Sequence, residues 1–188
     1  MTLEVKTMLK KLLAVLLILT ALCGCQKNNT RQLDEEKYNA YLAAYQAILD
    51  YEGKKESSAY FDIKLVCNKL SENSYRYDLI VDNPQVSMCE IMILMVEENI
   101  ALTIDTTRMM PSIGIFEDTA VNMIPFQVAQ DKGYVKGIDL SMLSNQSSMR
   151  AGIVVSFKNW DKTVTTREYF SLNAEYVEPE QPAEGQNP

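Results

Sequence analysis

The chain shows two kinds of hydrophobic spacing, one after the other. Between residues 34 and 53, apolar and aromatic side chains recur every three or four positions, which predicts an amphipathic helix. Asp34-Glu35-Glu36 would lie in its first turn, where the helix dipole favours acids, and Gly53 would follow its end. The recurring side chains are Tyr38, Tyr41, Leu42, Tyr45, Ile48 and Leu49. We expect this stripe to pack on the rest of the domain, the alternative being an exposed docking face for a partner or a glycan.

From residue 58 to residue 173 the spacing changes to alternation, the pattern of half-buried strands. The run from 88 to 96 is almost continuously apolar, which is typical of a central strand buried on both faces. Turn signals such as Asn83-Pro84 and the run 159–162 separate the segments. Strands are expected around residues 61–67, 75–81, 88–96, 100–104, 113–115, 134–142, 153–157 and 164–172.

This arrangement amounts to about seven or eight short strands with no long crossover helices, so a parallel sheet is excluded. We predict a mainly β fold, an antiparallel sandwich of two sheets preceded by one helix. In its pattern, the segment 58–173 resembles immunoglobulin-like β-sandwich ectodomains. The alternative is an α+β fold of cystatin-like type, with the helix on one curved sheet. The remaining residues, 174–188, are rich in Glu and Pro and are expected to form a disordered acidic tail.

The first residues have the character of a targeting segment. Lys6, Lys10 and Lys11 precede the apolar run 12–22, which is too short to span a bilayer and is typical of a secretory signal. The tetrad Leu22-Cys23-Gly24-Cys25 resembles the bacterial lipobox, and the resemblance covers residues 1–25. It implies cleavage of a signal peptide at 1–24 and a diacylglyceryl group on the Cys25 thiol. The polar residues up to 33 would then form a tether.

The resemblance places the protein on the extracytoplasmic face of the cell membrane, held by its lipid. The whole chain has a net charge of -7, from 18 basic and 25 acidic residues. Removing residues 1–24 takes away three lysines and one glutamate, so the mature charge becomes 15 minus 24, or -9. Anionic headgroups and nucleic acid would both repel such a body, so we expect no nucleic-acid partner and no basic membrane patch.

The residue types also limit the chemistry. The chain has no histidine, which excludes a Ser-His-Asp triad, a Cys-His pair and histidine-bound zinc. Glycine-rich phosphate loops are absent as well. We therefore expect no catalytic residues, no metal site and no cofactor. Paired carboxylates for glycosidic hydrolysis remain the alternative. The candidate acids are Glu97 and Glu98, Glu117 and Asp118, or Glu90 within the apolar run.

Five residues are candidates for contacts or a crosslink. Trp160 lies in a polar turn and would either contact a protein or a sugar or fold back over the sandwich. Met109 and Met110 would form an adaptable hydrophobic contact or plug one end of the core. Cys67 and Cys89 share their faces with core residues. They would be two buried thiols or, because the location is oxidising, a disulfide.

These observations favour a non-enzymatic lipoprotein that serves as a binding or accessory module of the cell envelope, and the chain resembles small surface lipoproteins in this respect. Its expected partner is an envelope protein or a glycan. The alternatives are a carboxylate-dependent cell-wall hydrolase and a lipoprotein that captures a toxic or exported polypeptide. The sequence leaves the oligomeric state open.

Overall fold

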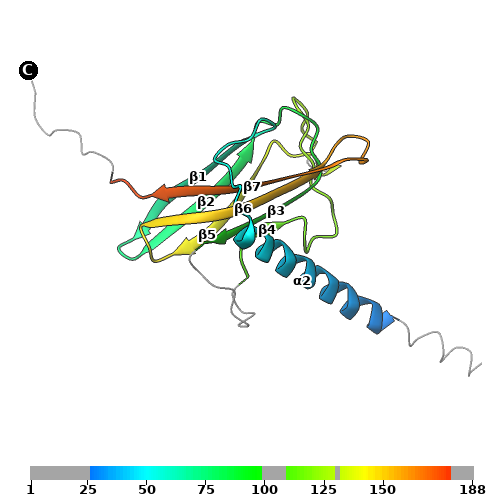
Figure 1. The fold of residues 1–188 in the computed structure, drawn as a ribbon, viewed down its shortest axis with the longest axis horizontal. Helices are drawn as coiled ribbons and strands as arrows, with labels where there is room; N and C mark the ends of the chain where they lie inside the picture. Colours follow the sequence, from blue (N-terminus) through cyan, green and yellow to red (C-terminus); the bar gives the residue numbers. More distant parts are fainter. Residues whose placement is uncertain (1–25, 99–108, 130–131, 179–188) are drawn as a thin grey trace, which may run out of the picture. The chain divides into compact units, whose positions relative to one another are not determined.

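The computed structural model of the protein describes residues 26–98, 109–129 and 132–178. In these ranges one helix precedes seven strands (Figure 1). The elements are α2 (Gln26–Asp50), β1 (Asp62–Ser71), β2 (Ser74–Asp82), β3 (Cys89–Glu97), β4 (Ser112–Ile113), β5 (Gly137–Ser144), β6 (Ser148–Lys158) and β7 (Thr165–Glu175). The expected signal peptide, Cys25, the strand at 100–104 and the tail from 179 lie outside the described residues. Within them, no helical segment combines the length and apolar character that a membrane span requires.

The strands form two antiparallel sheets, with the orders β1-β2-β5 and β4-β3-β6-β7. This confirms the predicted sandwich and not the single curved sheet of the cystatin-like alternative. When the strands are lettered A to G along the chain, the orders become A-B-E and D-C-F-G. An immunoglobulin constant domain has A-B-E-D and C-F-G. The two arrangements therefore differ only in the sheet that the fourth strand joins.

The core lies where the alternating apolar positions of the two sheets meet. On β2 the alternate residues Tyr77, Leu79 and Val81 are fully buried, as the period of two predicts. The ring of Phe61, just before β1, contacts those of Phe157 on β6 and Phe170 on β7, with centroids 6.2 and 5.8 Å apart. This aromatic cluster joins the two sheets at the side where β1 approaches β7.

Strand β3 has buried residues on both faces, and the last part of α2, from Ala40 to Asp50, packs on the outer face of its sheet. Residues from Ala40 onward form one compact unit, and in it Tyr41, Tyr45 and Ile48 of α2 are buried. The Tyr41 hydroxyl accepts a hydrogen bond of 2.9 Å from the backbone N–H of Met110. These contacts confirm that the stripe, from Tyr41 to Ile48, packs on the β-domain rather than serving as a docking face.

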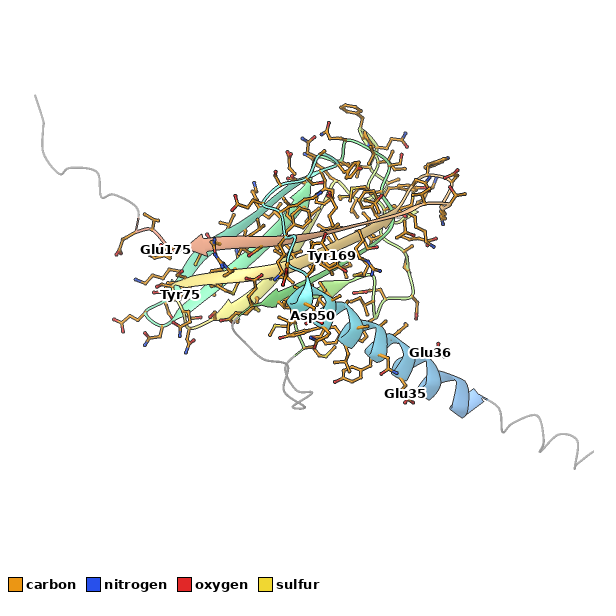
Figure 2. All side chains as sticks on the ribbon, in the orientation of Figure 1. Glu35, Glu36, Asp50, Tyr75, Tyr169 and Glu175 are labelled. Carbon is orange, nitrogen blue, oxygen red and sulfur yellow. The ribbon has the colours of Figure 1, made fainter. Side chains whose placement is uncertain are left out.

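The boundaries of two segments differ from the prediction. The helix begins at Gln26, not at residue 34, so the expected tether is helical and Asp34-Glu35-Glu36 lies inside the helix. The residues from 26 to 33 contain neither Gly nor Pro, so nothing in them stops a helix from continuing. At the other end, β7 continues to Glu175, two residues into the predicted tail. Figure 2 shows Glu175 and Tyr75 at the same end of the sandwich.

The segment between α2 and β1 runs along the outer edge of β7. The Lys55 N–H donates to the Tyr169 carbonyl at 2.9 Å, and the Ser171 N–H donates to the Lys55 carbonyl at 3.0 Å. The Glu168 carboxylate accepts hydrogen bonds from the Lys55 ammonium at 2.6 Å and from the Ser58 hydroxyl at 2.5 Å. Because β7 is the last strand of its sheet, this segment satisfies backbone groups that an edge strand would otherwise expose.

Candidate binding surface

Three connections gather at one end of the sandwich, which we call the loop end (Figure 1). They are residues 83–88 between β2 and β3, 114–136 between β4 and β5, and 159–164 between β6 and β7. Register explains the clustering, since Cys89 pairs with Lys158 and Asp82 pairs with Gly137. The last residues of β2 and β6 are therefore level with the first residues of β3 and β5.

Backbone hydrogen bonds fix the long connection against the start of β3. Met88 and Met123 exchange two hydrogen bonds of 2.8 Å, and the Ile91 N–H donates to the Val121 carbonyl at 2.9 Å. The next turn of the connection is held by Asn122, whose N–H donates to the Gly133 carbonyl at 2.8 Å. The irregular stretch is thus an ordered support for the residues that follow it.

A charged cluster ties the β6–β7 turn to β3. Glu90 lies in a β-bulge with φ of 49°, and its carboxylate contacts the ammonium groups of Lys158 at 2.7 Å and Lys162 at 2.8 Å. These hydrogen bonds lower the pKa of Glu90 to about 2. Its backbone N–H donates to the Asn122 side chain at 2.9 Å. The carboxylate is therefore a fixed anion that positions the turn, the opposite of the proton donor that a glycosidase needs.

The two remaining cysteines are free thiols. Cys67 belongs to β1 of one sheet, and Cys89 begins β3 of the other. The possible disulfide is therefore not formed in the structure. Of the two thiols expected to be buried, Cys89 is buried and Cys67 is only partly buried. Cys89 is buried, and desolvation raises the pKa of its thiol, so it remains protonated and packs as a small hydrophobe.

Phe126 is the most unusual residue of the loop end. It follows Pro125 in a tight turn that the Gln127 N–H closes by donating to the Ile124 carbonyl at 3.2 Å. Its φ of 62° corresponds to a position where such turns favour glycine, and its side chain is fully exposed. Neither backbone geometry nor packing accounts for a phenylalanine here. Strain of this kind together with exposure is typical of a site that contacts something else.

A hollow of about 580 Å³ lies between this turn and the β2–β3 connection. Its volume is within the range of small-ligand sites, roughly 300–1,000 Å³. Five of its lining residues are apolar, namely Pro84, Ile124, Pro125, Phe126 and Val128. The other five are polar or charged, namely Asp82, Asn83, Gln85, Gln127 and Lys136. We call this cavity the loop-end hollow.

Several polar side chains of the loop-end hollow have hydrogen-bonding capacity to spare. Among the described residues, the side chains of Asp82, Gln127 and Lys136 have no hydrogen-bond or ion-pair partner. Asn83 donates its side-chain amide to Asp62 at 2.9 Å, and Gln85 donates to the Asn83 carbonyl at 2.9 Å. The hollow therefore offers a bound molecule a carboxylate, an ammonium and an amide beside an aromatic ring.

The three residues that the sequence indicated as candidates for contacts, Trp160, Met109 and Met110, lie in different parts of the structure. Trp160 lies at the loop end with 62% of its surface exposed, so it does not fold back over the sandwich. Met110 is buried beneath Tyr41, whereas Met109 is exposed. Both methionines come just before Pro111, whose carbonyl accepts a hydrogen bond from the Met95 N–H of β3. Met95 is six residues along β3 from Cys89, so it lies about 20 Å from the loop end. Met109 and Met110 therefore do not share a surface with Trp160.

The carboxylates considered for hydrolysis are dispersed over the molecule. Glu98 pairs with Lys54 at 2.7 Å on the helix-covered side, and Glu117 accepts the Gly114 N–H at 2.8 Å. Glu97 ends β3, far along the strand from Glu90. In the described ranges no three acid or cysteine side chains converge in a way that would hold a metal ion. No known protein family, curated protein or solved structure matches the chain.

Proposed function

We propose that the protein is an extracytoplasmic lipoprotein, anchored through Cys25, whose β-sandwich is a non-enzymatic binding module of the cell envelope. The lipobox-like tetrad and the short apolar run before it support the anchor. The loop end supports the binding role, because it presents exposed apolar side chains from all three connections. These side chains are Val86, Phe126, Val128, Trp160 and Val164.

The single observation that carries the binding role is Phe126. A fully exposed aromatic ring on a turn that favours glycine stabilises nothing within the domain. Aromatic residues are enriched among the side chains that contribute most to binding, since they bury much surface at a low entropic cost. Backbone hydrogen bonds hold the turn that carries this ring, which reduces the backbone entropy lost on binding.

The topology gives a consistent analogy. In the lettering used above, the β2–β3 and β6–β7 connections are the B–C and F–G loops. In variable immunoglobulin domains, loops in these positions lie at the end that binds antigen. A fold supports many functions, so the analogy adds to the argument from Phe126 without replacing it.

The binding role is tested by crosslinking and affinity recovery of the intact chain from its native membrane. We expect Phe126→Ala and Trp160→Ala to reduce recovery of a stoichiometric partner. Leu143→Ala is the matched control, because Leu143 is a 63% exposed apolar residue on β5 near the opposite end of the sheet. Equal recovery with all three variants would contradict a binding role for the loop end.

The anchor is tested separately. Mass spectrometry of the mature N-terminus is expected to find a lipid-modified Cys25. The Cys25→Ser variant is expected to leave the membrane fraction, because each buried methylene of the lipid contributes about 0.8 kcal/mol to attachment. An unmodified cysteine, or an unchanged distribution of the variant, would contradict the proposed anchor.

A further inference from the structure

We propose that the loop-end hollow binds a neutral oligosaccharide, through the ring of Phe126 and the polar side chains of Asp82, Gln127 and Lys136. This assignment rests on the proposed binding function and names the chemistry of its ligand. Four properties of the hollow support it: the aromatic ring, the spare hydrogen-bonding capacity, the charge balance and the adjoining hollows.

The aromatic ring is suited to a sugar face. Phe126 is fully exposed at the edge of the hollow, and the turn that carries it is closed by its own backbone hydrogen bond. An aromatic face is electron-rich, so it attracts weakly positive hydrogens. One face of a pyranose ring presents a patch of such C–H groups, which a phenylalanine ring can cover without needing a hydrogen bond.

The spare polar groups match hydroxyls. Each sugar hydroxyl both donates and accepts hydrogen bonds, in the same way as a Ser or Thr hydroxyl. The Asp82 carboxylate accepts only, the Lys136 ammonium donates only, and the Gln127 amide does both. None of the three has a partner among the described residues, so a polyhydroxylated ligand would replace the water around these groups without breaking a hydrogen bond within that part of the protein.

The charge balance favours a neutral ligand. The loop-end hollow contains one acid and one base, Asp82 and Lys136, so its own charge is zero. The chain as a whole has a net charge of -7, and its field repels polyanions. Phosphate-rich or uronic-acid polymers are therefore disfavoured relative to neutral glycans.

The adjoining hollows favour more than one sugar unit. A hollow of about 480 Å³ shares Asp82 and Asn83 with the loop-end hollow. A smaller one of about 240 Å³ shares Asp82 and Lys136 with it. Asp82 thus lies where three depressions meet, at the loop end of the central strand β2 of the β1-β2-β5 sheet. A chain of sugars can occupy neighbouring depressions, whereas a single sugar would fill only one.

The test uses the full chain, purified in detergent, with cellotetraose, maltotetraose and chitotetraose as probes in isothermal titration calorimetry. We expect at least one tetrasaccharide to bind. Phe126→Ala should weaken that binding by about tenfold, the effect of losing one aromatic contact, and Phe126→Tyr should retain it. Lys136→Met should also weaken it, whereas the control Leu143→Ala should leave it unchanged.

Two outcomes separate this inference from the proposed function. If no tetrasaccharide binds while recovery of a native partner still depends on Phe126, the oligosaccharide assignment fails and the loop end binds a polypeptide. If recovery does not depend on Phe126 either, both the assignment and the binding role of the loop end fail. Binding that is equal in Phe126→Ala, Lys136→Met and the wild type would also overturn the assignment, because the sugar would then lie elsewhere.

Discussion

Gly152 of β6 lies directly beneath Ile48 of α2. A Cβ atom at residue 152 would approach the Ile48 Cγ2 atom to 2.6 Å, closer than side chains in proteins approach each other. The absence of a side chain at this one strand position allows the helix to pack against the sheet. At this point of the contact between helix and sandwich, one small residue lies opposite one branched residue.

This relationship predicts coupled mutations. Gly152→Ala should reduce the free energy of unfolding by about 1–3 kcal/mol through overpacking. Ile48→Ala should reduce it by about 2–5 kcal/mol, because it leaves a cavity. In the double variant the new methyl group occupies part of that cavity, so the combined loss should be smaller than the sum. Urea unfolding of the four proteins measures the coupling, and strict additivity would show that the two residues do not contact each other.

The Glu90 cluster predicts an acid-sensitive contribution to stability. The pKa of Glu90 falls from 4.5 to about 2 on folding, so the folded state favours the ionised form. A lowered pKa contributes stability above pH 4.5, and that contribution is lost as the pH falls toward 2. The stability gap between wild type and Glu90→Gln should therefore be largest above pH 4.5 and close near pH 2.

Urea unfolding across this pH range measures the gap, with Glu72→Gln as a control for the loss of an exposed negative charge. Added salt should narrow the gap, because the carboxylate is 33% exposed and its ion pairs are partly screened. A gap that is the same at both ends of the range would contradict the role of the two lysines.

The Phe126 turn predicts that loss of binding and loss of stability are separable. Phe126→Gly relieves the left-handed backbone, which costs a residue with a side chain about 1–2 kcal/mol. Glycine also makes the unfolded chain more flexible, so the net gain in unfolding free energy should lie between zero and about 1 kcal/mol. Phe126→Val should destabilise instead, since branching at Cβ tolerates this conformation poorly. A large loss of stability in Phe126→Gly would show that the ring packs on the domain.

A buried carboxylate on the outer face of the β1-β2-β5 sheet predicts a further stability effect. Asp78 is 5% exposed and accepts hydrogen bonds from Asn68 at 2.9 Å, Arg76 at 3.0 Å and Ser141 at 2.7 Å. Asp78→Ala leaves these donors unsatisfied and should reduce the unfolding free energy by about 1–3 kcal/mol. Asp139→Ala, an exposed acid on the same face, should change it by less than about 0.5 kcal/mol. Equal effects in thermal unfolding would contradict the importance of the network.

The strands could be predicted because burial imposes a period of two on their side chains. The strands expected around 153–157 and 164–172, on either side of the 159–162 turn, correspond to β6 and β7, in which Ile153 and Phe170 are direct partners. The apolar run at 88–96 also corresponds to β3, an inner strand of its sheet. In both cases the hydrophobic pattern of the strand reflects its packing against the core, to which many residues contribute.

The helix start could not be predicted by the same reasoning. Residues before Asp34 are polar and show no stripe, and a stripe appears only where a helix packs against something. The helix nevertheless continues to Gln26, because a formed helix propagates through residues that merely tolerate it. Hydrophobic spacing indicates where a helix is buried rather than where it begins.

The candidate site was only partly accessible from the sequence. The polar turn around Trp160 left open whether its side chain is exposed or folded back, and the structure shows it exposed. Phe126 follows an apolar segment, and the only signal near it was the turn marker Pro125. Its exposure depends on the Met88 and Met123 pairing, a contact between distant parts of the chain. Whether Cys67 and Cys89 are bridged likewise depends on their separation in the folded chain, which spacing in the sequence does not reveal.

The segment along β7 has a consequence for solubility. Without it, the Tyr169 carbonyl and the Ser171 N–H would be available to the strand of a second molecule, the usual route to intermolecular β-aggregation. Residues 51–58 therefore act as a gatekeeper that keeps the domain from polymerising at this edge. A truncation that begins at β1, convenient for recombinant production, removes the gatekeeper together with α2, which covers part of the sheet. It should yield material that aggregates with rising concentration.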